Sequence, residues 1–485
     1  MYLCFLFLQS TQNYIFMFTI VSTGLLGLAT LFVGAFEKTR WVIPFVIIGL
    51  LGIVGLHLSG VELASFPSFS NMIVVDGFAT GFSAILLFIT LGLFFFADYI
   101  FRNEEEYIAD IYGLMLFALC GAMIMVSYTN LTMLFLGVEI LSIPMYILAG
   151  SRRVNIASNE ASIKYFMMGA FASAIMLFGI TFIFGATNSL DMQAILLFVK
   201  TTNQPTTMFH VGILLVIFGF LFKIGAAPFH FWSPDVYQGS PIFITVFMST
   251  IVKIAAVGAF YKFITTIVPI NSVNPLDSIW FNVLWISAAL SFIIANLSAV
   301  GQTDIKRIMA FSSVSHAGFL LLPILAANTT SADALFYYVS VYSVASILFF
   351  GVLMLVAETK NELTLEDIRG LGIKSPFLVG CMVVALLSMA GIPPFAGFFA
   401  KFFTFKTAMD SSLNTLVIIG ILGSLVGVYY YFKIFLAAIK KPLPKTDTTP
   451  IHVPLTYTLM LGMCILFLIV VGLFPEKLQH ILHIF

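Results

Sequence analysis

Apolar residues fall into runs of about twenty along almost the whole chain, with short polar segments between them. A helix needs roughly 20 apolar residues to cross the ~30 Å hydrocarbon core of a bilayer. The sequence therefore predicts an all-α polytopic membrane protein. The runs place about fourteen spans at 14–35, 41–60, 74–97, 108–127, 130–150, 159–185, 207–231, 240–263, 278–300, 305–327, 331–357, 375–409, 412–439 and 452–474.

The basic residues between these spans fall mostly on one side of the predicted bundle. That side carries Lys38, Arg40, Arg102, Arg152, Arg153, Lys164, Lys306, Arg307, Lys360, Arg369, Lys374, Lys433, Lys440, Lys441 and Lys445, and the other side carries Lys200, Lys262, Lys406 and Lys477. The positive-inside rule makes the first side cytoplasmic. Because the number of spans is even, both termini are expected on the opposite, outer side.

Composition excludes several functional classes. With 60% hydrophobic and 9% charged residues, the chain does not resemble a soluble domain. Its net charge is zero and it has no long basic run, which gives no support to a nucleic-acid partner. The polar loops are too short for a nucleotide, flavin or metal-cluster module, so we expect no cofactor. The four cysteines, Cys4, Cys120, Cys381 and Cys464, form no CxxC pair and suggest structural thiols.

Four ionisable residues, Glu139, Lys223, Lys253 and Lys401, lie deep inside the predicted spans. A charge at the bilayer centre costs about 3 kcal/mol on insertion scales, so such residues usually face a polar interior and handle ions or protons. A structural role remains an alternative for the lysines and for the acid. A lysine could extend its ammonium to the interface, and Glu139 could be a protonated structural acid.

Two further polar features fit a structural role at least as well as a functional one. His316, in AFSSVSHAGFLLL, fits a neutral histidine bonded to a serine or a carbonyl at least as well as a proton relay. Glu160 and Lys164 have the i,i+4 spacing of a surface ion pair, which favours an anchor for a helix end.

Prolines interrupt two of the spans that carry lysines. Lys223 stands five residues before Pro228, and Lys401 stands seven residues after Pro394. Proline removes a helix hydrogen bond and frees carbonyls that side chains or water must satisfy. The two interruptions lie five spans apart, which predicts inverted-topology repeats formed by spans 4 to 8 and 9 to 13.

This pairing matches Glu139 with His316 and Lys223 with Lys401. It divides the chain into an N-terminal three-helix segment at 1–107, a first repeat at 108–263, a second repeat at 278–440 and a C-terminal helix at 441–485. Each repeat is expected to form a proton half-channel.

Several long motifs resemble the antiporter-like subunits of respiratory complex I and of Mrp-type cation/proton antiporters. They are GVEILSIPMYILAG, NEASIKYFMMGAFASAIMLFGITFIFGAT, FLFKIGAAPFHFWSPDVYQGSPIFITVFMSTIVKIAAVGAF, QTDIKRIMAFSSVSHAGFLLL and LLSMAGIPPFAGFFAKFFTF. The resemblance covers about residues 75 to 440. Three features favour one paralogue of the family: a lysine at 401 where another paralogue typically has glutamate, the lack of a long lateral helix after the last span, and the sequence motifs EASIKYF and PDVYQG.

The resemblance implies a role for each matched residue. Glu139 and Lys223 would form the family's pair of the fifth and seventh spans, Lys253 would be the central relay lysine, and Lys401 the terminal proton donor. Glu139 would favour the charged form of Lys223, and burial would oppose it. A shift of that pair would then pass through the other lysines as coupled titrations.

The implied function is proton translocation from cytoplasm to periplasm within NADH:quinone oxidoreductase of the bacterial inner membrane, driven by quinone reduction in other subunits. Expected partners are the membrane subunits that flank the chain and the lipid bilayer. Two alternatives stay open: a subunit of an Mrp-type sodium/proton antiporter, and a purely structural membrane-arm piece whose buried charges specify helix packing.

Overall fold

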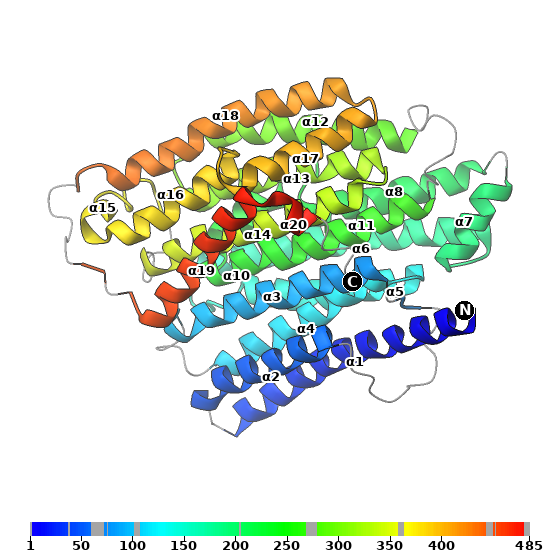
Figure 1. Ribbon diagram of the computed structural model, residues 1–485, viewed down its shortest axis with the longest axis horizontal. Coiled ribbons are helices and arrows are strands. Elements are labelled where there is room, and N and C mark those ends of the chain that lie inside the picture. The colour runs from blue at the N-terminus through cyan, green and yellow to red at the C-terminus, as the bar shows by residue number, and fades with distance from the viewer. Residues whose placement is uncertain are drawn as a thin grey trace.

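The structure is a bundle of long helices that run roughly parallel to one another (Figure 1). The computed structural model describes residues 2–36, 39–59, 72–74, 76–100, 107–202, 205–267, 279–356, 363–442, 450–451 and 453–479. These residues form helices, turns and three isolated bridges, with no β-strand among them. The predicted all-α membrane fold is therefore confirmed.

The helices follow the predicted spans closely along the chain. The first half of the chain contains α1 (Tyr2–Ala35), α2 (Thr39–Ser59), α3 (Gly77–Ile100), α4 (Ile108–Ser127), α5 (Leu131–Ala149), α6 (Ile156–Thr187), α7 (Met192–Thr201), α8 (Thr207–Ile224), α9 (Trp232–Gly239), α10 (Ile242–Phe247) and α11 (Lys253–Ile267). The second half contains α12 (Ile279–Val300), α13 (Ile305–Ala326), α14 (Ser331–Val356), α15 (Leu371–Lys374), α16 (Pro376–Ala390), α17 (Ala396–Asp410), α18 (Asn414–Ile439), α19 (Leu455–Leu473) and α20 (Pro475–Gln479).

Thirteen continuous apolar segments in the described residues are long enough to cross a membrane. The one remaining predicted span, the twelfth at 375–409, is present as two helices of 15 residues each, α16 and α17. The count of about fourteen spans therefore agrees with the sequence prediction. The short helices α7, α9, α15 and α20 were not predicted, because each is too short to give a membrane-spanning run.

The two spans that carry Lys223 with Pro228 and Lys401 with Pro394 are broken, as predicted. In the seventh span, α8 ends at Ile224 and Gly225 adopts a left-handed conformation with φ 68°, whose N–H bonds to Leu221 and Phe222 carbonyls. In the twelfth span, Gly391 adopts φ 82° after α16, and α17 starts at Ala396. Glycine is favoured at both positions because a Cβ atom disfavours the left-handed region.

The eighth span has an irregularity that the sequence did not predict. Between α10 and α11, residues Met248–Val252 form a π-helical turn that ends directly at Lys253. Such turns add a residue to a helix and are frequent at functional sites.

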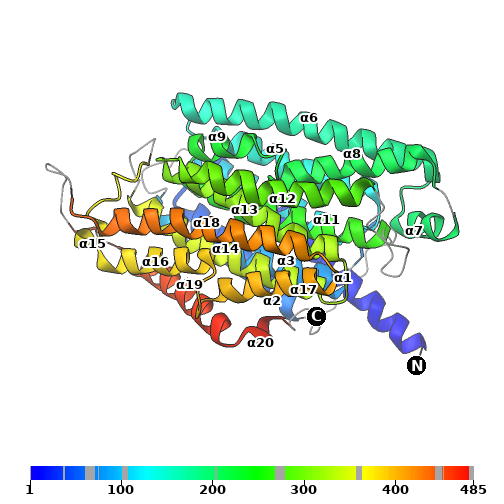
Figure 2. The ribbon, with the colours of Figure 1, turned by 90° about the horizontal axis from the view of Figure 1, so that it is seen from above.

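Three spans form the centre of the bundle. All of the most apolar window of α13 is buried, as are 94% of that window in the α10–α11 span and 89% in α14. Helices α1 and α2 lie at one edge and α18 at the opposite edge (Figure 1), while α6 lies along another face (Figure 2). The central spans carry Lys253 and His316, which places both residues far from the lipid-facing surface.

The loops with the most basic residues lie at one end of the bundle. Backbone hydrogen bonds join Gly370 to Lys440 and Ile305 to Leu363, and the Lys433 ammonium bonds to the Val300 carbonyl. These contacts support the alternation on which the predicted orientation depends. Lys38, Arg102, Lys360 and Lys445 lie outside the described residues, as do Met1 and residues 480–485 at the termini.

The packing of α17 on α16 predicts the effect of a single methyl group. A Cβ atom at Gly397 would stand 1.7 Å from the Ser388 carbonyl oxygen, whereas a Cβ atom at Gly380 would meet nothing within 4 Å. Gly397→Ala must push the two half-helices apart, and we expect it to lower stability by at least about 1–3 kcal/mol. Gly380→Ala on α16 is the matched control and should be neutral or stabilising by up to about 1 kcal/mol.

Thermal denaturation of the purified assembled complex, followed by the amount of this subunit that stays soluble, measures both effects. Equal melting behaviour of the two variants would contradict the close contact of α16 and α17.

Candidate functional site

Lys223 lies at the end of α8, where the first break begins. Its side chain is 5% exposed, and its ammonium donates to Ser142 Oγ at 2.7 Å and to the Tyr146 hydroxyl at 3.1 Å. Both acceptors belong to α5. The break therefore directs a buried lysine toward neutral oxygen atoms of the fifth span.

Glu139 also lies on α5, three residues before Ser142 and thus on the same helix face. Its Oε1 atom is buried and has no hydrogen-bond partner among the described residues. Lys223 and Glu139 form no ion pair within the described part of the chain, so the expected contact is absent in this structure. Lys223 instead meets α5 at Ser142 and Tyr146, about one and two turns beyond the acid.

Lys253 follows the π-helical turn and points toward α13. Its ammonium donates to the Ser313 carbonyl at 2.6 Å and to the Ser313 hydroxyl, and it lies 5.2 Å from the centre of the Tyr342 ring. The side chain is only 4% exposed. The central lysine is thus held by one serine and by the face of an aromatic ring, a favourable position for a cation.

His316 stands three residues after Ser313 on α13 and has partners on both ring nitrogens. Nδ1 lies 2.6 Å from the Tyr338 hydroxyl, and Nε2 lies 3.0 Å from the Tyr431 hydroxyl. The His316 and Tyr342 rings are 4.7 Å apart between centroids. Tyr342 therefore lies against both Lys253 and His316.

Lys401 lies on α17, directly after the second break. Its ammonium donates to the Ala390 carbonyl at 2.7 Å and to Ser424 Oγ at 2.8 Å, and it lies 5.1 Å from the Phe319 ring centre. Ala390 is the last residue of α16, so its carbonyl is one that the break leaves without a helical donor. As predicted, a side chain donates a hydrogen bond to a carbonyl that the break has freed.

A small cavity of about 10 Å³ joins His316 and Lys401. It is wide enough for about one water molecule. The walls come from α13, α14, α16 and α17 and include Tyr338, Tyr342 and Ser388. Tyr342 thus lies between Lys253 and His316, and the cavity lies between His316 and Lys401. Lys223 and Glu139 form a separate group around α5.

The two broken spans hold their lysines differently. Lys223 precedes its break at the end of the first half-helix, and Lys401 follows its break on the second half-helix. The two lysines that the sequence pairs with each other therefore stand on opposite sides of their breaks.

Sequence reasoning missed the tyrosines and serines that contact the buried lysines and His316. They are Ser142, Tyr146, Ser313, Tyr338, Tyr342, Ser424 and Tyr431. A signal existed, because α14 begins with SADALFYYVSVYSV, and a buried tyrosine hydroxyl usually finds a polar partner. Among the described residues, no group of three or more His, Cys, Asp or Glu residues could hold a metal ion.

Comparison with known proteins gives a family for this site. Residues 128–427 match the family described as NADH:quinone oxidoreductase/Mrp antiporter, TM. NADH-quinone oxidoreductase subunit N of Flavobacterium psychrophilum is 41% identical over 465 residues, which cover 96% of this chain and 100% of that protein. The protein of the same name from Cytophaga hutchinsonii is 39% identical over 462 residues, 94% of this chain and 97% of that protein.

Solved structures show the same fold. A chain of respiratory complex I from Thermus thermophilus with bound aureothin superposes with a TM-score of 0.79 at 29% identity, covering 95% of this chain and 98% of that chain. A chain of the Mrp complex from Dietzia sp. DQ12-45-1b gives a TM-score of 0.83 at 19% identity, covering 96% and 95%. The second likeness establishes the fold alone.

These findings confirm the resemblance that the motifs predicted, including the paralogue favoured by Lys401 and by the wording EASIKYF. The matched family region begins at Tyr128, before Glu139, and ends at Gly427, after Lys401, so it contains every candidate site residue. The chain belongs to the NADH:quinone oxidoreductase/Mrp antiporter family, in which subunit N is the paralogue that its sequence resembles.

Proposed function

We propose that this chain is a proton-translocating membrane-arm subunit of NADH:quinone oxidoreductase. Protons pass from the cytoplasm to the periplasm through Glu139, Lys223, Lys253, His316 and Lys401, which we call the proton relay. The observation that carries the proposal is the continuous series from Lys253 through Tyr342 and His316 to the cavity at Lys401. Each of these groups can hold or pass a proton, and their separations are short enough for hydroxyl groups or a single water to bridge.

The Glu139 and Lys223 group supplies a switch for this series. Ser142 and Tyr146, which accept from the Lys223 ammonium, follow Glu139 on α5 by about one and two helical turns. A small movement of α8 along α5 would let Lys223 exchange these neutral oxygens for Glu139. An ammonium is stabilised by a carboxylate much more than by a hydroxyl, so this exchange changes how tightly Lys223 holds its proton.

The energy for this movement comes from quinone reduction in other subunits. The chain acts as a part of an enzyme complex, and we expect no redox centre in it. Its partners are the complex I membrane subunits that flank it. The location is the bacterial inner membrane, with the basic loops on the cytoplasmic side and both termini on the periplasmic side.

The alternative, a subunit of an Mrp-type sodium/proton antiporter, has the same fold and could use the same lysines. The fold does not favour either function, since the Mrp chain superposes as well as the complex I chain. The 41% identity to a subunit N along its whole length favours the complex I function. Copurification with quinone oxidoreductase subunits, rather than with an antiporter complex that lacks redox partners, tests this choice.

Lys223→Ala tests the relay at its first lysine. The substitution removes the ammonium that Ser142 and Tyr146 hold, and we expect proton pumping by the assembled complex to fall by at least about tenfold, with coupled oxidoreductase activity falling too. Lys200→Ala is the matched control, because Lys200 is an exposed lysine on α7 and should be dispensable. Dye-monitored acidification of inverted membrane vesicles, driven by NADH, measures the pumping.

Normal pumping and normal oxidoreductase activity in Lys223→Ala, at wild-type amounts of assembled complex, would refute the proposed relay.

Lys401→Arg tests the last lysine. A guanidinium stays protonated under all physiological conditions, so arginine retains the charge and cannot release the proton. We expect this variant to assemble and to lose most of its pumping, about tenfold or more. Lys406→Arg, an exposed position on the same helix α17, should pump normally. If the two arginine variants pump equally well, Lys401 does not lie on the proton path.

A further inference from the structure

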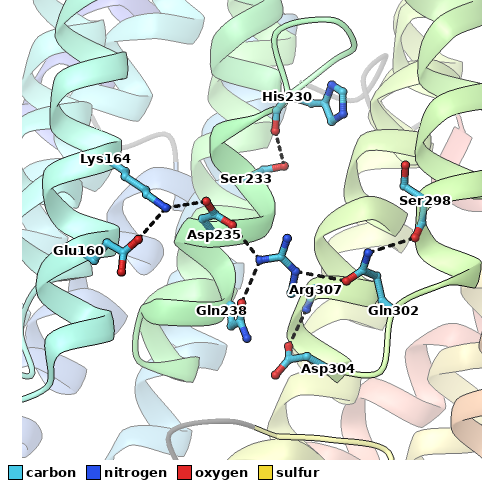
Figure 3. Close-up of polar contacts among 10 residues, drawn as sticks. All are labelled: Glu160, Lys164, His230, Ser233, Asp235, Gln238, Ser298, Gln302, Asp304 and Arg307. Carbon is cyan, nitrogen blue, oxygen red and sulfur yellow. Dashed lines mark hydrogen bonds and ion pairs between the residues drawn. The ribbon is translucent and has the colours of Figure 1, made fainter.

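A cluster of charged residues lies outside the proton relay, at the end of the bundle that carries the basic loops. It consists of Glu160 and Lys164 on α6, Asp235 on α9, and Arg307 on α13, which we call the ion cluster (Figure 3). The predicted i,i+4 pair of Glu160 and Lys164 is confirmed, at 2.7 Å. The same lysine also reaches Asp235, which the sequence did not reveal.

Asp235 is the centre of the ion cluster because its two oxygens have different partners. Oδ2 lies 2.7 Å from the Lys164 ammonium, and Oδ1 lies 2.7 Å from Arg307 Nη1. Lys164 belongs to the first predicted repeat and Arg307 to the second. One carboxylate therefore joins the two repeats.

Helix α13 holds α9 through further contacts from its first turn. Arg307 also donates to Gln238 Oε1 at 2.9 Å and to Gln302 Oε1 at 3.2 Å (Figure 3). The Lys306 ammonium donates to the backbone carbonyls of Gln238 and Ser240. These carbonyls lie at the carboxyl end of α9, where a cation is favourable.

The rest of α9 connects the two lysine groups of the relay. Trp232 donates to the Phe222 carbonyl at 3.1 Å, next to Lys223 at the end of α8. The Tyr237 hydroxyl lies 3.3 Å from Ser313 Oγ, and Ser313 accepts both hydrogen bonds of Lys253. The orientation of α9 therefore decides where Tyr237 meets the residue that holds Lys253.

The ion cluster is not needed to explain the stability of the fold. The side chains of Lys164, Asp235 and Arg307 are 42%, 37% and 28% exposed, and ion pairs this exposed contribute little to stability. Asp235 nevertheless stays ionised. Its partial burial opposes ionisation, but the hydrogen bonds from Lys164 and Arg307 outweigh it and leave the pKa of this carboxyl below its ordinary value.

We propose that Asp235 is a positioning residue of the proton relay: by joining Lys164 of one repeat to Arg307 of the other, it fixes α9 between Lys223 and Lys253. The inference rests on the proposed function. A movement at Lys223 then reaches Lys253 through α9 only while Asp235 contacts both Lys164 and Arg307.

Asp235→Asn, Arg307→Gln and the double variant form a double-mutant cycle that tests this role. In assembled complex, we expect each single change to lower proton pumping between about two- and thirtyfold, the usual range of long-range coupling. The double variant should pump about as well as the more impaired of the two single variants, because both changes break the same link. Asp235→Glu keeps the charge and should recover most of the pumping, a rescue that simple loss of packing would not give.

Asp110→Asn provides the matched control, since Asp110 is an exposed acid in the first turn of α4 and has no part in the ion cluster. All rates are divided by the amount of assembled complex on native gels. If Asp235→Asn does not assemble, Arg307→Lys replaces it. A lysine keeps the charge but cannot reach Asp235, Gln238 and Gln302 together, so reduced pumping is again expected.

Wild-type pumping in Asp235→Asn, or in Arg307→Lys where that variant is used, would overturn the inference, as would losses that multiply in the double variant. Lys253→Met, measured in parallel, separates this failure from that of the proposed function. If Lys253→Met pumps normally, the relay itself is wrong. If Lys253→Met is inactive while Asp235→Asn pumps normally, only the positioning role is wrong.

Discussion

A lysine ammonium inside an apolar bundle needs oxygen atoms around it, and the interior of this protein is organised to supply them. Hydroxyl groups of α5 surround Lys223, a serine of α13 holds Lys253, and the open carbonyl end of α16 with a serine of α18 holds Lys401. None of the three has a carboxylate partner among the described residues. The ammonium groups are therefore solvated by neutral dipoles, an environment that a proton can leave without separating an ion pair.

The two breaks provide oxygen atoms for their lysines in different ways. The break after α8 turns the chain so that the helix end with Lys223 faces α5, and its carbonyls are taken by Gly225 and Trp232. The break after α16 instead offers its own carbonyl to Lys401 on the next half-helix. The two broken spans, which the sequence predicts to be counterparts, thus hold their lysines in unequal surroundings.

Much of the fold and part of the site followed from the sequence. Long apolar runs predict the spans because the bilayer demands about twenty residues. Pro228 and Pro394 lie at the two breaks, where proline cannot donate a helix hydrogen bond. Pro44, Pro144 and Pro323 lie inside continuous helices, so proline alone does not predict a break. The depth of Lys253 within its span was enough to single it out. The contacts of Asp235 were not predictable, since its partners lie 71 and 72 residues away along the chain. The separation of Lys223 from Glu139 also depends on how α8 sits against α5, which no spacing within either helix specifies.

The π-helical turn before Lys253 decides which neighbour this lysine faces. Such a turn holds one residue more than a regular helix requires, and each residue turns an α-helix by about 100°. In a regular helix without that residue, Lys253 and everything after it would face a different neighbour. The π-helical turn therefore sets the direction in which Lys253 leaves its span, and it brings this lysine onto Ser313.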